Sequence, residues 1–146
     1  MLIREMQEKD LLMVHEMECS IFTKPWTADD FKKSFQNHQN IYLVVEEEDQ
    51  IIAYCGLWGV AGEGQINNVA VKKEIRGCGI GYAMLSVLIK KGKEDGLDAF
   101  TLEVRVSNEA AITLYHKLGF KDSGIRKNFY EEPAEDALIM WLRQND

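Results

Sequence analysis

"NNVAVKKEIRGCGIG", residues 67–81, is the stretch that decides the fold of this chain. Its first part is apolar and β-branched, and together with the preceding residues it predicts a strand over 64–71. Its second part, 76–81, is rich in glycine. Apolar residues then recur at helical spacing from Ile80 onward, which predicts a helix over 79–95. The sequence therefore predicts a strand, a glycine loop and a helix in direct succession.

The glycine loop predicts a binding site for an anion. Gly77, Gly79 and Gly81 let the chain turn its N–H groups inward because no Cβ is in the way. The positive end of the following helix points to the same place, and Arg76 adds a cation. A Walker A loop is excluded, because its last glycine must be followed by Lys and then by Ser or Thr, whereas Gly81 is followed by Tyr82 and Ala83. The spacing also disfavours a dinucleotide fingerprint, which needs G-x-G-x-x-G. A phosphate or pyrophosphate site remains, with a tight packing turn as the structural alternative.

The bulk properties of the chain limit the classes of function. Its 146 residues fit a single domain, 1–146, and its net charge of −7 argues against a nucleic-acid surface while suiting a cationic partner. We expect no membrane span and no signal peptide, because no long apolar run is present. The three cysteines and three histidines are scattered. This pattern favours a reduced, cytoplasmic protein without a disulfide framework or a metal site.

Periodicity along the rest of the chain predicts a mixed α/β domain. The expected order is β-α-α-β-β-β-α-β-α-β-β, which gives a mostly antiparallel sheet of about seven strands with helices on both faces. Thr27 is expected to cap the second helix, Asn108 to cap the last one and Gly119 to end it. The predicted strands cover 2–6, 41–46, 51–60, 64–71, 99–106, 120–126 and 136–142, with a loop over 127–135, and the first two helices cover 8–22 and 28–35.

Two motifs together resemble the signatures of the GNAT superfamily of acetyl-CoA-dependent N-acetyltransferases. They are the opening stretch and "TLEVRVSNEAAITLYHKLGF", residues 101–120. Three further segments are similar to the bacterial RimI-type ribosomal-protein alanine N-acetyltransferases: "PWT" (25–27), "LEVRVSNEAAITLY" (102–115) and "RKNFYEEPAEDALIM" (126–140). The resemblance implies the acyl-CoA N-acyltransferase fold, acetyl-CoA as co-substrate and no metal. It also implies acetylation of the N-terminal alanine of a small-subunit ribosomal protein.

The resemblance places the catalytic base at Glu103 and the catalytic acid at Tyr115. Without the resemblance, the sequence favours a solvated strand residue paired with Arg105 for Glu103, and a core residue beside Leu114 and Leu118 for Tyr115. A carboxylate with a pKa of about 4.3 is a weak base, so it suits an α-amino group with a pKa of about 8 better than a lysine with a pKa of about 10.4. A buried phenol can donate a proton to a leaving thiolate without being ionised at rest.

The resemblance also assigns the contacts to the co-substrate. It expects backbone groups of β-strand residues beside the acetyl and pantetheine arm, a pyrophosphate loop, and a contact from the residue that caps the last helix. In chain order these are Val69, Ala70, Val71, Arg76, Gly77, Cys78, Gly79, Ile80, Gly81, Tyr82 and Asn108. An acyl-cysteine route through Cys78 is disfavoured, because no His or Cys partner is near it in the sequence.

The peptide substrate is expected between two loops, one at Pro25 and Trp26 and the other from Tyr130 to Asp136. The acids of the second loop suit a basic peptide, and their alternative is a solvated acidic loop. Two other functions stay open from the sequence: an acetyltransferase for a small amine such as a polyamine, and a non-catalytic acyl-CoA-binding module. The presence of both Glu103 and Tyr115 argues against the second of these, because a sensor needs neither.

Overall fold

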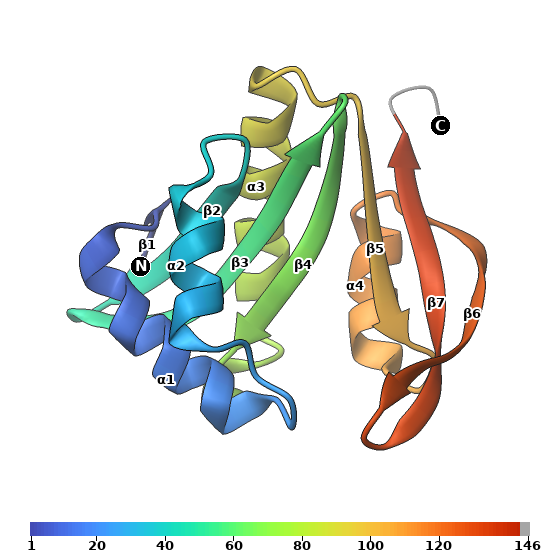
Figure 1. Cartoon of the computed structure of the whole chain (residues 1–146), viewed down its shortest axis with the longest axis horizontal. Helices are drawn as coiled ribbons and strands as arrows, with labels where there is room; N and C mark the ends of the chain where they lie inside the picture. Colours follow the sequence, from blue (N-terminus) through green and yellow to red (C-terminus); the bar gives the residue numbers. More distant parts are fainter. Residues whose placement is uncertain (144–146) are drawn as a thin grey trace.

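The computed structural model describes residues 1–143, and its seven strands and four α-helices follow the predicted order (Figure 1). The last three residues of the predicted domain, 144–146, lie outside the described residues. The strands are β1 (Leu2–Glu5), β2 (Ile41–Glu47), β3 (Gln50–Val60), β4 (Glu63–Val71), β5 (Ala99–Arg105), β6 (Lys121–Glu131) and β7 (Ala134–Arg143). The helices are α1 (Leu11–Ile21), α2 (Ala28–Gln36), α3 (Ile80–Glu94) and α4 (Glu109–Lys117), with single 3-10 turns at Glu8–Asp10 and Lys73–Ile75.

The sheet consists of two antiparallel parts joined by one short parallel pair. Its strand order is β1-β2-β3-β4-β5-β7-β6, and only β4 and β5 run parallel. These two strands pair from Glu63 opposite Ala99 to Gln65 opposite Thr101 and then separate, so a gap opens between their carboxyl ends (Figure 1). The predicted fold class is confirmed, and the gap is the feature that positions the site.

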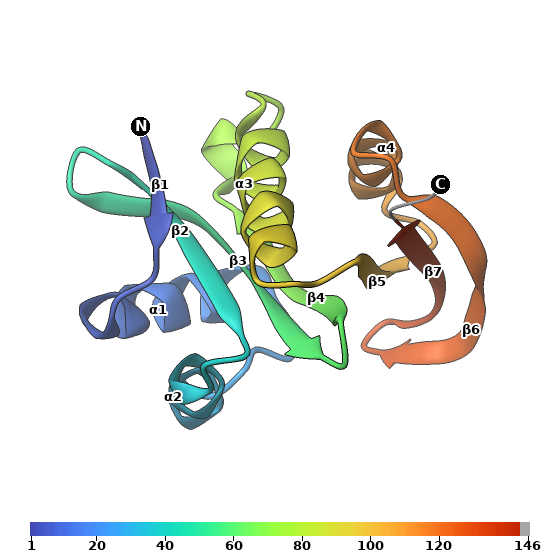
Figure 2. The same cartoon turned by 90° about the horizontal axis from the view of Figure 1, so that it is seen from above.

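Helices cover both faces of the sheet, α1 and α2 on one side and α3 and α4 on the other (Figure 2). Strand alternation supplies a core for each face, since Leu43 and Val44 are neighbours in β2 but belong to different clusters. Leu43 packs in the cluster of Leu85 on α3, and Val44 packs in the cluster of Phe31 on α2. Within residues 1–143 no helix is both long and apolar enough to cross a membrane.

The helix signals read from the sequence are confirmed. The Thr27 hydroxyl accepts a hydrogen bond from the Asp30 N–H at 3.1 Å, and the Asp30 carboxylate accepts one from the Thr27 N–H at 3.0 Å. Asn108 caps α4 through the Ala111 N–H at 3.2 Å. Gly119 follows α4 with φ 103°, a conformation that glycine adopts without strain.

Two predictions about the strands after α3 are wrong. The loop expected over 127–135 is mostly strand, because β6 continues to Glu131 and β7 begins at Ala134. A bulge between Arg126 and Tyr130 accommodates the polar residues that suggested a loop, and Asn128 adopts φ 54° there. Val106, the last residue of the predicted strand 99–106, lies just beyond β5 and is 40% exposed.

Candidate active site

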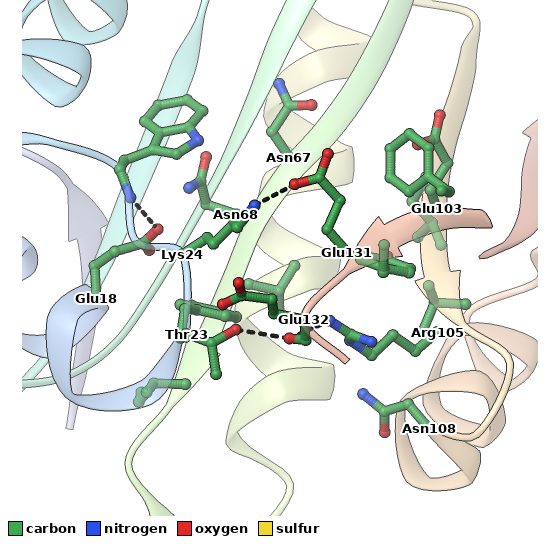
Figure 3. Close-up of a pocket in the computed structure, with 18 of the residues that line it drawn as sticks. Glu18, Thr23, Lys24, Asn67, Asn68, Glu103, Arg105, Asn108, Glu131 and Glu132 are labelled. Carbon is green, nitrogen blue, oxygen red and sulfur yellow. Dashed lines mark hydrogen bonds and ion pairs between the residues drawn. The ribbon is translucent and has the colours of Figure 1, made fainter. Parts of the chain in front are cut away.

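A pocket of about 560 Å³ lies where β4 and β5 separate. Its walls come from α1, the α1–α2 loop, β4, β5, the start and end of α4, and the β6–β7 hairpin (Figure 3). Residues that line it include Glu18, Trp26, Asn67, Asn68, Val69, Glu103, Arg105, Asn108, Tyr115 and Tyr130. The pocket therefore gathers both predicted catalytic residues together with part of each predicted binding set.

Glu103 projects from β5 on the face opposite the buried Leu102 and Val104. Its side chain is 18% exposed, and its Oε1 accepts a hydrogen bond from Arg126 Nη1 at 3.0 Å. The expected alternative partner, Arg105, pairs instead with Glu135 at 3.2 Å and with the Pro133 carbonyl at 2.8 Å. Glu103 is thus a pocket-facing carboxylate held by an arginine of β6.

Tyr115 belongs both to the core and to the pocket. It is 7% exposed and packs against Phe120, with ring centroids 5.9 Å apart. Burial raises the pKa of its hydroxyl well above the ordinary value, so the group stays protonated at neutral pH. Among residues 1–143 its hydroxyl has no hydrogen-bond partner, although it lines the pocket. A protonated donor therefore stands at the pocket wall.

The glycine loop lies outside this pocket, between the end of β4 and the start of α3. Gly77 and Gly79 adopt φ 83° and 81°, and a Cβ at either position would meet nothing within 4 Å. Gly81 has a different role, because a Cβ there would lie 3.1 Å from Leu114 of α4. Arg76 is anchored by a hydrogen bond from its Nε to the Val71 carbonyl at 2.9 Å. An exposed loop of this shape at a helix start fits a pyrophosphate.

Of the remaining residues predicted to contact the co-substrate, some line the pocket, some are buried away from it, and some are exposed at the glycine loop. Val69 lines the pocket, and the β4 backbone from Ile66 onward does not pair with β5, so it can accept an extended ligand. Ala70 is 3% exposed and faces the α1 and α2 side. Asn108 lines the pocket while it caps α4, so its two predicted roles are compatible. Ile80 is buried, whereas Cys78 and Tyr82 are exposed at the loop.

The two loops predicted to hold a peptide contact each other across the pocket mouth (Figure 3). The Thr23 hydroxyl donates to the Glu132 carbonyl at 3.0 Å, and Lys24 forms an ion pair with Glu131. Trp26 and Tyr130 line the pocket, whereas Pro25 and Asp136 do not.

Several acids of the second loop already have partners within the chain. Asp136 accepts a hydrogen bond from the Asn128 N–H at 2.9 Å and so supports the bulge of β6. Glu135 accepts one from the Ser107 N–H at 2.8 Å in addition to its pair with Arg105. Glu132 keeps its carboxylate free of hydrogen bonds among residues 1–143. The acidic loop is therefore in large part internally paired.

Sequence reasoning missed the polar residues on the β4 side of the pocket. Glu18 is 3% exposed, and its carboxylate accepts hydrogen bonds from the Tyr54 hydroxyl and from the Trp26 N–H, the latter at 3.0 Å. Asn67 Nδ2 and Asn68 Oδ1 are buried without a hydrogen-bond partner among the described residues. A signal was available for Glu18, because it follows Val14 by four positions and so falls on the apolar face of α1.

No group of three His, Cys, Asp or Glu side chains within residues 1–143 is arranged to hold a metal ion. The side chains of the pocket can perform acid–base chemistry. They include a carboxylate on β5, a protonated phenol on α4 and a buried carboxylate on α1, around a cavity with a free strand edge.

Comparison with known proteins gives consistent matches along the chain. The model of the Acetyltransferase (GNAT) family matches residues 11–120. A Bacillus subtilis (strain 168) protein provisionally named ribosomal protein bS18-alanine N-acetyltransferase is 42% identical over 99% of this chain and 96% of its own length. The ribosomal protein bS18-alanine N-acetyltransferase of Haemophilus influenzae is 34% identical over 95% of this chain and 96% of its own. The crystal structure of the ribosomal-protein-S18-alanine N-acetyltransferase from Escherichia coli superposes with a TM-score of 0.89 at 31% identity, covering 97% of this chain and 92% of that one.

Proposed function

Because the chain belongs to the GNAT family of acetyltransferases, we propose that it transfers the acetyl group of acetyl-CoA to the N-terminal alanine of a small-subunit ribosomal protein. The observation that supports this choice of substrate is the similarity to relatives named for this reaction. It extends over nearly the whole chain at 34–42% identity. With such a substrate the enzyme works in the cytoplasm, and residues 1–146 act as one catalytic domain.

The residues present fit acetyl-CoA. A Cβ at Gly77 or Gly79 would meet nothing within 4 Å, so this open loop has room for the pyrophosphate, which its N–H groups would hold. The backbone of β4 near Val69, which does not pair with β5, would lie along the pantetheine arm. Acetyl-CoA supplies the acetyl group as an activated thioester. No step in this proposal uses Cys78, which is exposed at the loop and does not line the pocket.

Glu103 is proposed as the base that accepts a proton from the α-ammonium of the peptide, directly or through a water molecule. Arg126 holds one carboxylate oxygen, and the other has no hydrogen-bond partner among residues 1–143 and is available to the substrate. An α-amino group with a pKa of about 8 loses its proton readily enough for a carboxylate of modest basicity.

Tyr115 is proposed as the acid that protonates the leaving sulfur. Its raised pKa keeps the hydroxyl protonated before the thiolate leaves. The hydroxyl has no hydrogen-bond partner within the described residues, so it is free to donate its proton to the sulfur. Glu103 and Tyr115 come from consecutive elements, β5 and α4, so one local unit of the fold would carry both proton transfers.

The test offers acetyl-CoA with two peptides: the N-terminal peptide of ribosomal protein bS18 beginning with alanine, and the same peptide already acetylated at its α-amine. Mass spectrometry should find one acetyl group added to the first peptide and none to the second. Equal acetylation of both peptides would refute N-terminal specificity and point to side chains. Faster acetylation of a free polyamine in the same assay would favour a small-amine acetyltransferase instead.

A further inference from the structure

Glu18 is a buried carboxylate that faces the pocket without a cation to balance it. Its two oxygens accept hydrogen bonds from the Tyr54 hydroxyl and the Trp26 N–H, and both donors are neutral. Within residues 1–143 no Lys, Arg or His forms an ion pair with it. The two cationic side chains that line the pocket are committed elsewhere, Lys24 to Glu131 and Arg105 to Glu135.

A buried charge of this kind is costly unless a cation compensates it. The hydrogen bond from Tyr54 reduces the cost but does not remove the charge, since burial and the adjacent carboxylate keep that phenol protonated by raising its pKa. Glu18 also lines the open space of the pocket, so a ligand can reach it. A cationic group of the ligand would complete its environment.

Asn68 provides a second, independent indication at the same wall. It is 4% exposed, and its Oδ1 is buried without a donor among the described residues, although the residue lines the pocket. Buried polar atoms normally have a partner, so an orphan acceptor at a pocket wall indicates a ligand that donates. Glu18 and Asn68 can therefore both accept hydrogen bonds from N–H groups of a ligand.

The sheet register places the two residues on one face. Tyr54 on β3 stands opposite Ala70 on β4, and Gly56 stands opposite Asn68. The side chains of Tyr54, Ala70 and Asn68 therefore share the face that α1 covers, where Tyr54 reaches Glu18. In Figure 3 Glu18 and Asn68 lie on one side of the pocket, whereas Glu103 and Arg105 lie on the other.

We propose that Glu18 and Asn68 form the subsite that receives the α-ammonium group of the substrate's first residue before the reaction. The proposal rests on the proposed function, because it assigns the wall that holds the same amine from which Glu103 takes a proton. An ammonium group carries three N–H donors. The Glu18 carboxylate and Asn68 Oδ1 accept two of them, and the third remains free to be removed from the β5 side. Glu18 is in this view a binding residue, and Glu103 remains the base.

The test compares the affinities of two peptides in the presence of saturating coenzyme A, where no acetyl group can be transferred to them. One is the bS18 N-terminal peptide with its free amine, and the other is its N-acetylated form, which lacks the positive charge. We expect wild type to bind the free-amine peptide more tightly by about tenfold or more, since hydrogen bonds to charged groups are the strong ones. Glu18→Gln should lower this ratio about tenfold, and Asn68→Ala should lower it by a smaller factor.

Glu16→Gln is the matched control, because it makes the same change on an exposed residue of the same helix and should leave the ratio unchanged. A Glu18→Gln variant that weakens both peptides equally would keep the ratio and overturn the proposal, since Glu18 would then only hold the Trp26 loop. A wild-type ratio near one would overturn it as well. If Glu18→Gln does not fold, Asn68→Ala decides, because its Oδ1 makes no hydrogen bond to lose, and an unchanged ratio in that variant refutes the subsite. The proposed function fails separately, if wild type does not acetylate the free-amine peptide.

Discussion

Replacing Gly79 by alanine tests whether the glycine loop exists for the ligand or for the fold. Gly79 precedes α3 with φ 81°, and Gly96 follows the same helix with φ 91°. A Cβ at either position would meet nothing within 4 Å. Alanine at either site would therefore be strained by the positive φ alone, without a steric clash. Gly96→Ala is therefore a matched control for Gly79→Ala.

The expected loss of stability is the same for both variants. An alanine in the left-handed region costs about 1–2 kcal/mol in the free energy of unfolding. For a chain of 146 residues this corresponds to a fall in Tm of roughly 3–6 °C. Thermal denaturation of the two purified variants measures this common effect.

Binding of acetyl-CoA should separate the two variants. Alanine keeps the backbone N–H, but its Cβ would enter the open space beside the loop that the pyrophosphate is proposed to fill, and so would displace the ligand from its donors. A backbone N–H that donates to a charged pyrophosphate contributes about 1.5–3 kcal/mol, and loss of one such bond weakens binding about 10- to 100-fold. We expect that increase in Kd for Gly79→Ala, measured by titration calorimetry without a peptide, and no change for Gly96→Ala. Equal Kd values for wild type and both variants would refute the pyrophosphate loop and leave the glycines as a packing turn.

Three further predictions address catalysis and stability. Glu103→Gln should lower kcat by about 10²–10⁴-fold while acetyl-CoA affinity stays the same, and a parallel loss of affinity in calorimetry would mean that Glu103 is structural. Tyr115→Phe should lower kcat by a similar factor with Tm nearly unchanged, because its buried hydroxyl has no partner in residues 1–143, and unchanged kcat would exclude it as the acid. Burial opposes ionisation of Asp10, but hydrogen bonds from Arg4 and from the Gln7 N–H outweigh it and hold the pKa of Asp10 below its usual range. Asp10→Asn should therefore cost about 2–3 kcal/mol at pH 7. Urea denaturation should show the difference shrinking as pH falls below about 4, where the carboxylate of the unfolded chain becomes protonated, and vanishing only below the lowered pKa of the folded state. An equal cost at pH 7 and pH 3 would contradict this assignment.

The element order could be predicted because each element carries a local signal. Alternation marks β5, the glycine loop and its apolar stripe mark α3, and Thr27 and Asn108 mark helix starts through their own hydrogen bonds. The bulge of β6 could not be predicted in the same way. The bulge is held by pairing with β7, where Asp136 accepts a hydrogen bond from the Asn128 N–H, so the outcome depends on contacts between strands and not on local preference.

For the candidate site, the sequence predicts the residues that belong to motifs but not the contacts that those residues make. Glu103 and Tyr115 follow from the resemblance, but the partner of Glu103 does not, because Arg126 reaches it from another strand while Arg105 turns to Glu135. The helical spacing places Glu18 on the apolar face of α1, but its contact with Tyr54 becomes visible only when α1 covers the face of the sheet that carries Tyr54. Contacts between distant segments carry the information that the sequence pattern lacks.

The separation of β4 and β5 connects the fold to the proposed chemistry. Three paired positions hold the two parts of the sheet together, and beyond them each strand presents a free edge to the pocket. That arrangement gives up backbone hydrogen bonds that a continuous sheet would make, and an extended thioester ligand can restore part of them. It also puts two carboxylates on opposite walls, Glu18 from α1 and Glu103 from β5, with Tyr115 between the sheet and α4. An amine held by the first carboxylate would face the base and the acid across the same gap, so one interruption of the sheet can serve binding, deprotonation and protonation together.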